Sequence, residues 1–344
     1  MKKSLIALAV LAASGTAFAQ SSVTLFGVVD AAYAKGSGSV SDKTQLKNSG
    51  YNSSRIGFRG TEDLGGGLKA SFWLEAGVNN DDGTAAASNT NNQAVTGANA
   101  GTQGLTFNRR STLSLEGGFG ELRLGRDYTP QFWTETAFDP FGTNGVGTNI
   151  AFNKGGVTGV RASNSIGYLS PSFSGVKVWV QTYMGENAST AAVKAGDGNA
   201  IRLTYDNGPL NLAFATSTTK VAVATDNKTS NIAGAYNLGF VRLMAQSNKT
   251  QVDGAVDIKG SLIGATAPLG AGTVRASMSS TAQADKKSNQ FAVGYVYGLS
   301  KRTDLYATFA SVKNKGGAAV ALNGSVTGAN EKSSGYDFGI KHSF

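Results

Sequence analysis

The sequence predicts an all-β fold: a transmembrane antiparallel up-and-down β-barrel of about sixteen strands, with its third long loop folded into the lumen. Three observations support this. Apolar and polar residues alternate in the last ten residues, 335–344, and short turns alternate with longer polar loops along the chain. No apolar run of about 18 residues follows residue 20, which argues against a membrane-spanning helix. Barrel strands do not contain such runs, because apolar and polar residues alternate along them and their hydropathies average out.

The first residues predict an exported protein. Residues 1–3 are Met-Lys-Lys, residues 5–13 are apolar, and residues 17–19 read Ala-Phe-Ala, a typical cleavage site. We therefore expect residues 1–19 to be a cleaved signal peptide and residues 20–344 to form a single barrel domain. Loss of the two lysines lowers the formal charge from +9 to +7, and the absence of cysteine leaves no disulfide framework.

Period-two segments separated by turn residues run through the whole mature chain. Glycine is frequent, at 46 of 344 residues, as many tight turns require. The predicted strands are 23–33, 51–59, 68–76, 105–116, 120–127, 161–170, 176–185, 200–206, 210–219, 230–237, 240–249, 258–267, 273–282, 288–297, 304–313 and the terminal segment. The longer polar loops are 36–50, 80–104, 128–160, 186–198 and 314–332. A soluble β-sandwich is the alternative, but an open sheet this long would leave unpaired edges.

The last strand shows the pattern most clearly. Tyr336, Phe338 and Ile340 share one face, and Phe344 resumes that phase at the terminus, while polar residues such as Asp337 occupy the other face. We interpret this segment as the closing strand, with its apolar face toward lipid and its polar face toward a wet lumen.

The same parity places four arginines on the lumen side: Arg55, Arg59, Arg110 and Arg161. Like charges a few ångströms apart repel by roughly 2–4 kcal/mol per pair at an effective dielectric near 20. Folding does not call for such a group, whereas an anion path does. The alternative is that each arginine is separately paired with a lumen acid, for which the candidates are Asp30, Glu75 and Glu116.

Two further arginines, Arg109 and Arg126, fall on the outward phase. An arginine facing mid-membrane lipid costs roughly 2–4 kcal/mol. Either a bulge turns such a side chain inward, or that face meets another subunit.

Residues 128–160 are rich in aromatics and too apolar for a solvated loop. We expect this segment to fold into the barrel and narrow it, with its aromatics on the inner wall and Glu135 and Asp139 facing the arginines.

These residues resemble a trimeric general porin of Gram-negative outer membranes, most closely the β-proteobacterial porins. The resemblance covers essentially the whole mature chain. It rests on five segments: Val23-Thr24-Leu25-Phe26-Gly27, the run from Arg55 to Gly67 (RIGFRGTEDLGGG), Arg109-Arg110-Ser111, Gly125-Arg126-Asp127 and the terminal Phe344.

The resemblance implies a 16-stranded barrel that trimerises through its first and last strands. It implies a pore constriction with Arg55, Arg110 (or Arg109) and Arg161, faced by Asp139. It also makes Arg126 a subunit-interface residue held by loop 80–104 of a neighbour. Where many relatives read Pro-Glu-Phe-Gly, residues 139–142 here read Asp-Pro-Phe-Gly.

We therefore predict an outer-membrane pore for passive diffusion of small hydrophilic solutes and ions, with an anion preference. The alternative is a substrate-specific anion channel for phosphate or organic acids. An enzyme is disfavoured because the only histidine is His342, cysteine is absent and no metal-ligand spacing occurs. No cofactor, metal or nucleic-acid partner is expected. The expected partners are two further copies of the chain, outer-membrane lipid and lipopolysaccharide, and the outer-membrane assembly machinery, which would bind the C-terminal strand at Phe344.

Overall fold

The computed structural model describes residues 22–93, 104–191, 194–222 and 225–344. The predicted signal peptide, residues 1–19, lies outside these ranges. None of the helices in the described ranges is long and apolar enough to cross a membrane.

The described residues form eighteen strands and two short helices. Two strands are minor additions: β2 (Lys43–Asn48) pairs with β1, and β5 (Thr84–Ala85) pairs with β4. The helices are α2 (Pro130–Ala137) and the 3-10 helix η2 (Gly156–Thr158). The other strands are β1 (Ser22–Gly38), β3 (Arg55–Gly65), β4 (Leu68–Asn79), β6 (Arg110–Gly117), β7 (Gly120–Tyr128), β8 (Arg161–Leu169), β9 (Val176–Tyr183), β10 (Gly198–Asn207), β11 (Leu210–Ala222), β12 (Thr225–Asn237), β13 (Arg242–Val252), β14 (Ile258–Leu269), β15 (Gly272–Gln283), β16 (Lys286–Gly298), β17 (Thr303–Lys315) and β18 (Lys332–Ser343).

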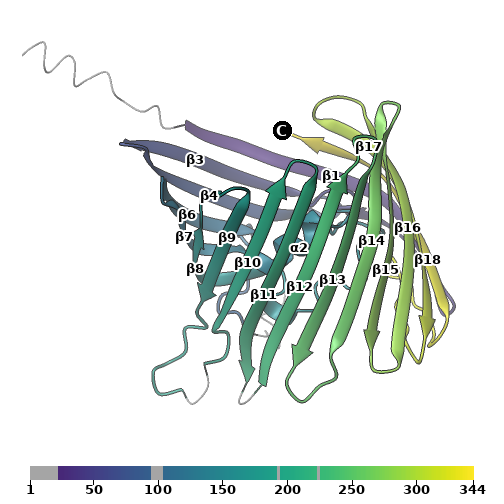
Figure 1. The fold of residues 1–344 in the computed structure, drawn as a ribbon. Helices are drawn as coiled ribbons and strands as arrows, with labels where there is room; N and C mark the ends of the chain where they lie inside the picture. The colour runs from purple at the N-terminus through teal and green to yellow at the C-terminus, as the bar shows by residue number, and fades with distance from the viewer. Residues whose placement is uncertain (1–21, 94–103, 192–193, 223–224) are drawn as a thin grey trace, which may run out of the picture.

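These sixteen strands close into an antiparallel barrel, which confirms the predicted fold class (Figure 1). Each pairs with the next along the chain, and β1 closes the ring by pairing with β18 over residues 28–38 and with β3 over residues 22–28. Phe344 completes the closure, because Gly27 and Phe344 each donate a backbone N–H to the other's carbonyl at 3.1 Å. A Cβ at Gly27 would lie 2.3 Å from the Phe344 ring, so this position requires glycine.

Side chains alternate between the two faces as the sequence predicts. In β18, the side chain of Phe338 is 58% exposed on the outer surface, whereas Asp337 is 1% exposed on the inner one. Short turns, such as the one between β10 and β11, lie at one end of the barrel, and the longer loops lie at the other (Figure 1).

The segment between β7 and β8 folds into the lumen, and we call it the inward loop (residues 129–160). It begins with α2, whose first residue is Pro130, a position where the missing N–H is harmless. The loop predicted over residues 128–160 did not include this helix, and the loop predicted over residues 36–50 did not include β2.

The inward loop packs against one side of the barrel, over small inward side chains. Phe138 lies among buried residues of β11, β12 and β13, namely Ala213, Ala233, Ala235 and Met244. Phe141 and Val146 pack against Ala292 and Ala310 on β16 and β17. A Cβ at Gly264 would lie 2.5 Å from the Pro140 ring. The opposite side of the lumen, formed by β3, β4, β6, β7 and β8, is left uncovered apart from Tyr128, which packs against Phe132 of α2, and it carries the candidate site.

Candidate functional site

A cavity of about 700 Å³ separates the inward loop from the uncovered side of the barrel. Its charged side chains are five arginines and one glutamate: Arg55, Arg59, Arg109, Arg110, Arg161 and Glu75. The loop contributes aromatic and neutral polar side chains instead, among them Trp133, Thr136 and Asn144. The five arginines predicted for a constriction therefore lie around one space.

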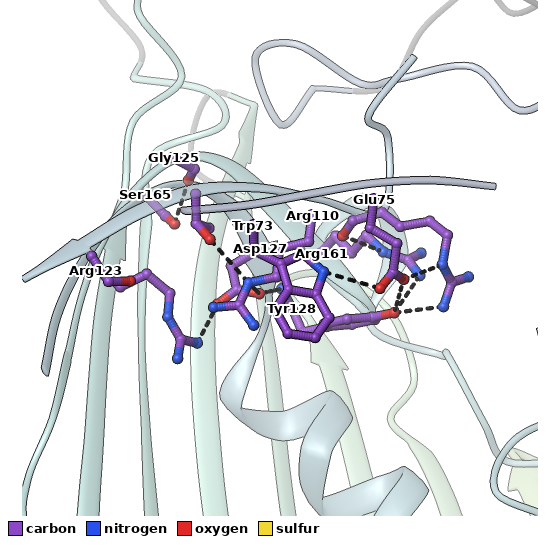
Figure 2. A network of polar contacts seen from close by, with 12 residues as sticks. Trp73, Glu75, Arg110, Arg123, Gly125, Asp127, Tyr128, Arg161 and Ser165 are labelled. Carbon is purple, nitrogen blue, oxygen red and sulfur yellow. Dashed lines mark hydrogen bonds and ion pairs between the residues drawn. The ribbon is translucent and has the colours of Figure 1, made fainter. Parts of the chain in front are cut away.

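Glu75 on β4 is the buried anion of this group. Its carboxylate lies 2.6 Å from Nε of Arg109 and 4.0 Å from Nε of Arg55, and it accepts a hydrogen bond from Nε1 of Trp73 at 3.1 Å (Figure 2). One carboxylate thus serves two guanidinium groups. The alternative that every arginine has its own acid does not hold for this pair.

Tyr128, the last residue of β7, links the arginines to the inward loop. Its hydroxyl accepts hydrogen bonds from Arg109 at 2.6 Å and from Arg161 at 3.1 Å. The Arg161 guanidinium lies 4.5 Å from the centre of the Tyr128 ring, and Phe132 on α2 stacks on the same ring at 4.9 Å. The start of the loop and the positions of two arginines are therefore set by one side chain.

A second ion cluster, next to this group, surrounds Asp127. Arg123 donates to Asp127 at 2.6 Å and to Glu121 at 2.7 Å, while Nε of Arg110 lies 3.6 Å from Asp127 (Figure 2). Parity places these residues on the lumen face, as it does Arg110.

Two of the five arginines have no carboxylate within ion-pairing distance among the described residues. Arg161 donates from Nε to the carbonyl of Arg109 at 3.0 Å. Arg59 is exposed to the lumen, and its guanidinium lies over the rings of Phe26 and Trp73, at 5.2 and 5.1 Å from their centres. Their charges are left for a mobile anion or water to balance.

A buried aspartate positions Arg55. Asp30 accepts backbone N–H bonds from Tyr51 at 2.8 Å and from Asn52 at 2.6 Å, together with the hydroxyl of Tyr306. The segment so held presents the Asn52 side chain, which accepts a bond from Arg55 at 3.2 Å. Asp30 was considered at the sequence level as a direct partner of an arginine, and here it acts through backbone instead.

The two arginines on the outward phase are both accommodated within the chain. Arg109 precedes the first residue of β6, so strand parity does not apply to it, and it turns to Glu75. Arg126 lies at a bulge between Gly125 and Asp127, where its guanidinium donates to Ser163 Oγ at 2.7 Å and to the carbonyls of Asn108 and Asn89. Asn89 belongs to the same chain's loop 80–104, of which residues 94–103 lie outside the described ranges, so a neighbour's loop is not needed to satisfy Arg126.

The acids of the inward loop lie elsewhere than expected. Neither Glu135 nor Asp139 lines the cavity, and both are buried, at 3% and 5% exposure. Asp139 accepts backbone N–H bonds of its own loop, from Phe141 at 2.9 Å, and from Thr143 and Asn149 at 3.2 Å. A carboxylate that completes a loop in this way cannot also face the arginines across the lumen, which corrects the expected placement.

Burial also decides the charge of these two acids. Loss of hydration raises the pKa of Glu135 to about 8, and it raises the pKa of Asp139 to about 6 although three backbone N–H groups oppose the rise. At neutral pH Glu135 is therefore mostly protonated, whereas Asp139 is mostly ionised, with its carboxylate held by backbone N–H groups of its own loop.

Some lumen residues escaped the sequence analysis. Arg275 on β15 is buried between the rings of Tyr51 and Phe141, at 4.7 and 4.8 Å, and Arg202 on β10 donates to Thr134 of α2 at 3.1 Å. The alternation of side chains along β15 and β10 would have placed both arginines on the lumen face. In the described part of the chain, no three His, Cys, Asp or Glu side chains are grouped as a metal site would require.

Comparison with known proteins agrees with this geometry. The family model described as Gram-negative porin matches residues 5–317. The chain is 40% identical to outer membrane porin protein 32 of Delftia acidovorans, with all of both chains covered. It is 30% identical to an outer membrane porin protein of Bordetella pertussis, covering 91% of this chain and 95% of that one.

Among solved structures, the chain is similar to an anion-selective porin from Comamonas acidovorans. The TM-score is 0.82 at 36% identity, over 94% of this chain and 100% of that one. With its closed sixteen-stranded barrel and inward loop, the chain belongs to the family of Gram-negative porins, channel proteins of the outer membrane.

Proposed function

We propose that this outer-membrane pore passes small hydrophilic solutes by passive diffusion and prefers anions because of its arginines. The observation that carries the proposal is the charge around the cavity, where five guanidinium groups face one carboxylate side chain. The similar protein from Comamonas acidovorans is described as an anion-selective porin, which points the same way.

The physical reason lies in the low dielectric of the surroundings. A passage lined by one sign of charge focuses the field and raises the local concentration of the opposite ion. Arg59 and Arg161 contribute most to this field, because the other three arginines have Glu75 or Asp127 within 4.0 Å. The aromatic and neutral loop side adds no opposing charge, so a cation meets a barrier that an anion does not.

A substrate-specific anion channel remains the second candidate, and one observation favours it. Arg59, Arg110 and Arg123 line a further cavity that shares residues with the first, so arginines continue along the wall, although Glu116 and Glu121 line this cavity too. A specific channel saturates with its solute, whereas a diffusion pore conducts in proportion to concentration.

The test is the reversal potential of the purified protein in a planar bilayer under a tenfold KCl gradient. We expect a potential toward the chloride limit of about 59 mV. The double variant Arg59→Gln, Arg161→Gln should move it toward zero, whereas Arg302→Gln, in a turn between β16 and β17, serves as the matched control. A cation-directed potential in the unaltered protein would overturn the proposal.

We further propose the homotrimer that the resemblance implies, with Arg126 near the subunit interface. Chemical cross-linking of membranes, followed by gel analysis, tests it. The contacts with lipopolysaccharide and with the assembly machinery through Phe344 remain predictions.

A further inference from the structure

Three of the guanidinium groups around the cavity lie close over aromatic rings. Arg110 lies 4.8 Å from the centre of the Trp73 ring, Arg161 lies 4.5 Å from that of Tyr128, and Arg59 lies over Phe26 and Trp73. A guanidinium that lies over a ring can still bind an oxyanion through its N–H edges, but Arg110 and Arg161 already use N–H groups within the protein, on Thr112 and on Tyr128 respectively. The wall therefore presents oriented, flat cations rather than mobile point charges.

Arg59 is the most available of these cations. It is exposed, and no carboxylate in the described ranges lies within 4.0 Å of it. Its unstacked N–H edges thus suit a ligand carboxylate, which binds two parallel N–H groups.

Across the cavity, the inward loop presents Trp133. This indole is 39% exposed, although it lies in a polar lumen, and its neighbour Tyr128 meets it in a T-shaped contact at 5.3 Å. Phe132 lies 6.0 Å from the same indole, which nevertheless stays partly exposed and lines the cavity that Arg59 also lines. An exposed indole in such a place suits a flat apolar ligand.

We propose that this cavity is a binding subsite for planar aromatic carboxylates, with the carboxylate on Arg59 and the ring against Trp133. The inference rests on the proposed anion-preferring pore and names a class of solute within it. The cavity, at about 700 Å³, falls within the usual range of small-molecule sites, which runs from roughly 300 to 1,000 Å³.

The charge of the cavity favours an aromatic carboxylate over a sugar, which is the other flat ligand that aromatic rings bind. Sugars stack on indoles without needing a counter-charge, but the cavity carries four more cationic than anionic side chains, five arginines against Glu75. An uncharged sugar leaves these arginines unbalanced, whereas a carboxylate reduces their mutual repulsion.

The test compares two anions of equal charge and similar size on the same channel. Benzoate and cyclohexanecarboxylate are each titrated against the KCl current of the purified protein in a planar bilayer. We expect benzoate to reduce the current at a concentration about fivefold lower than the non-aromatic acid, as stacking on an indole implies. Equal potency of the two acids, or a block by glucose at the concentration where benzoate acts, would overturn the inference.

Two variants assign the effect to residues. Trp133→Leu should bring the benzoate to cyclohexanecarboxylate ratio close to one, and Arg59→Lys, which keeps the charge but not the flat fork, should lower it. Arg302→Lys is the matched control at a turn outside the cavity, and the ratio there should match the unaltered protein. A ratio unchanged in Trp133→Leu contradicts the proposal.

The KCl reversal potential of each preparation separates the two proposals. An anion-directed potential together with equal potency of the acids overturns only the aromatic subsite. A cation-directed potential overturns the anion-preferring pore, and the subsite with it.

Discussion

Two walls face the same lumen with opposite chemistry. The wall of β3, β4, β6, β7 and β8 carries the arginines with Glu75 and Asp127, and it is left uncovered. The wall of β11 to β17 carries mostly small side chains, such as Ala213, Gly264 and Ala310, and the inward loop covers it together with Arg275, which is buried against Phe141. Both walls follow the same alternation of strand side chains.

The difference shows that the size of the wall side chains decides where the loop packs, whereas their charge acts on the solute. Alanine and glycine leave room for Phe138 and Phe141 to approach the strands, whereas a row of arginines leaves none and would be desolvated by a covering loop. Because the loop packs on the small residues of one wall, the arginines of the other wall stay hydrated. Three predictions test this division.

The largest effect is expected on the charged wall, from Glu75→Gln. This change leaves Arg109 and Arg55 without their buried counter-charge, so we expect the free energy of unfolding to fall by about 3–5 kcal/mol. Urea unfolding, followed by the mobility shift of the folded barrel on gels, measures it. The surface pair Lys249–Asp257, 2.9 Å apart, provides the control: Asp257→Asn should leave the urea midpoint nearly unchanged, because solvent screens an exposed ion pair. An equal loss of stability in the two variants would contradict the role of Glu75 as the buried counter-charge of Arg109 and Arg55.

The stability of the folded protein is expected to depend on pH because of Glu135 in the inward loop. The pKa of Glu135 is raised to about 8 by burial, with Asp139 raising it further and Lys154 opposing the rise. The folded state therefore binds more protons than the unfolded state between about pH 4.5 and pH 8. Stability should be highest at the acidic end, fall as pH rises through this window, and level off above it.

Urea midpoints at pH 5, 7 and 8.5 measure this decline, and Glu135→Gln should flatten it because glutamine does not titrate. We expect the effect to reach about 2 kcal/mol, less than the full value of a shift of this size, because the structure can relax around the charge. A decline equally steep in the variant would exclude Glu135 as its source.

The smallest effect is expected on the small-residue wall, from Gly264→Val. The added side chain meets Pro140, since a Cβ there would already lie 2.5 Å from it. It should push the inward loop toward the arginines at a cost of about 1 kcal/mol, the lower end for overpacking. The single-channel conductance should fall. The neighbour Ala265 points to the outer face of the same strand, so Ala265→Val is the matched control and should leave the conductance unchanged. An increased conductance in Gly264→Val would show that the loop moves the other way.

The barrel itself could be predicted because the alternation of side chains along each strand is a local pattern. Strand alternation correctly predicted that Arg55, Arg59 and Arg110 face the lumen, since the register shift in β3 falls only beyond them, at residues 63–65. The alternation at the terminus correctly predicted the closing strand. Arg126 could not be resolved by that rule, because a bulge shifts the register between β7 and β8 at this residue.

The inward loop shows the limit of sequence reasoning. Its aromatic content predicted that it folds inside, but nothing local shows that Asp139 accepts three backbone N–H groups instead of facing the arginines. The small inward residues of β11 to β17 were visible in the sequence and would have indicated which wall the loop covers.

The closure at Gly27 and Phe344 has a kinetic consequence. The contact joins residues separated by nearly the whole chain, so its loop-closure entropy is the largest of any strand pair, and folding rates fall as contacts become less local. Until the last strand docks, β1 and β18 expose two unpaired edges that can pair with other chains. The slow step of folding, and the period of greatest exposure to aggregation, should therefore be the docking of the final strand.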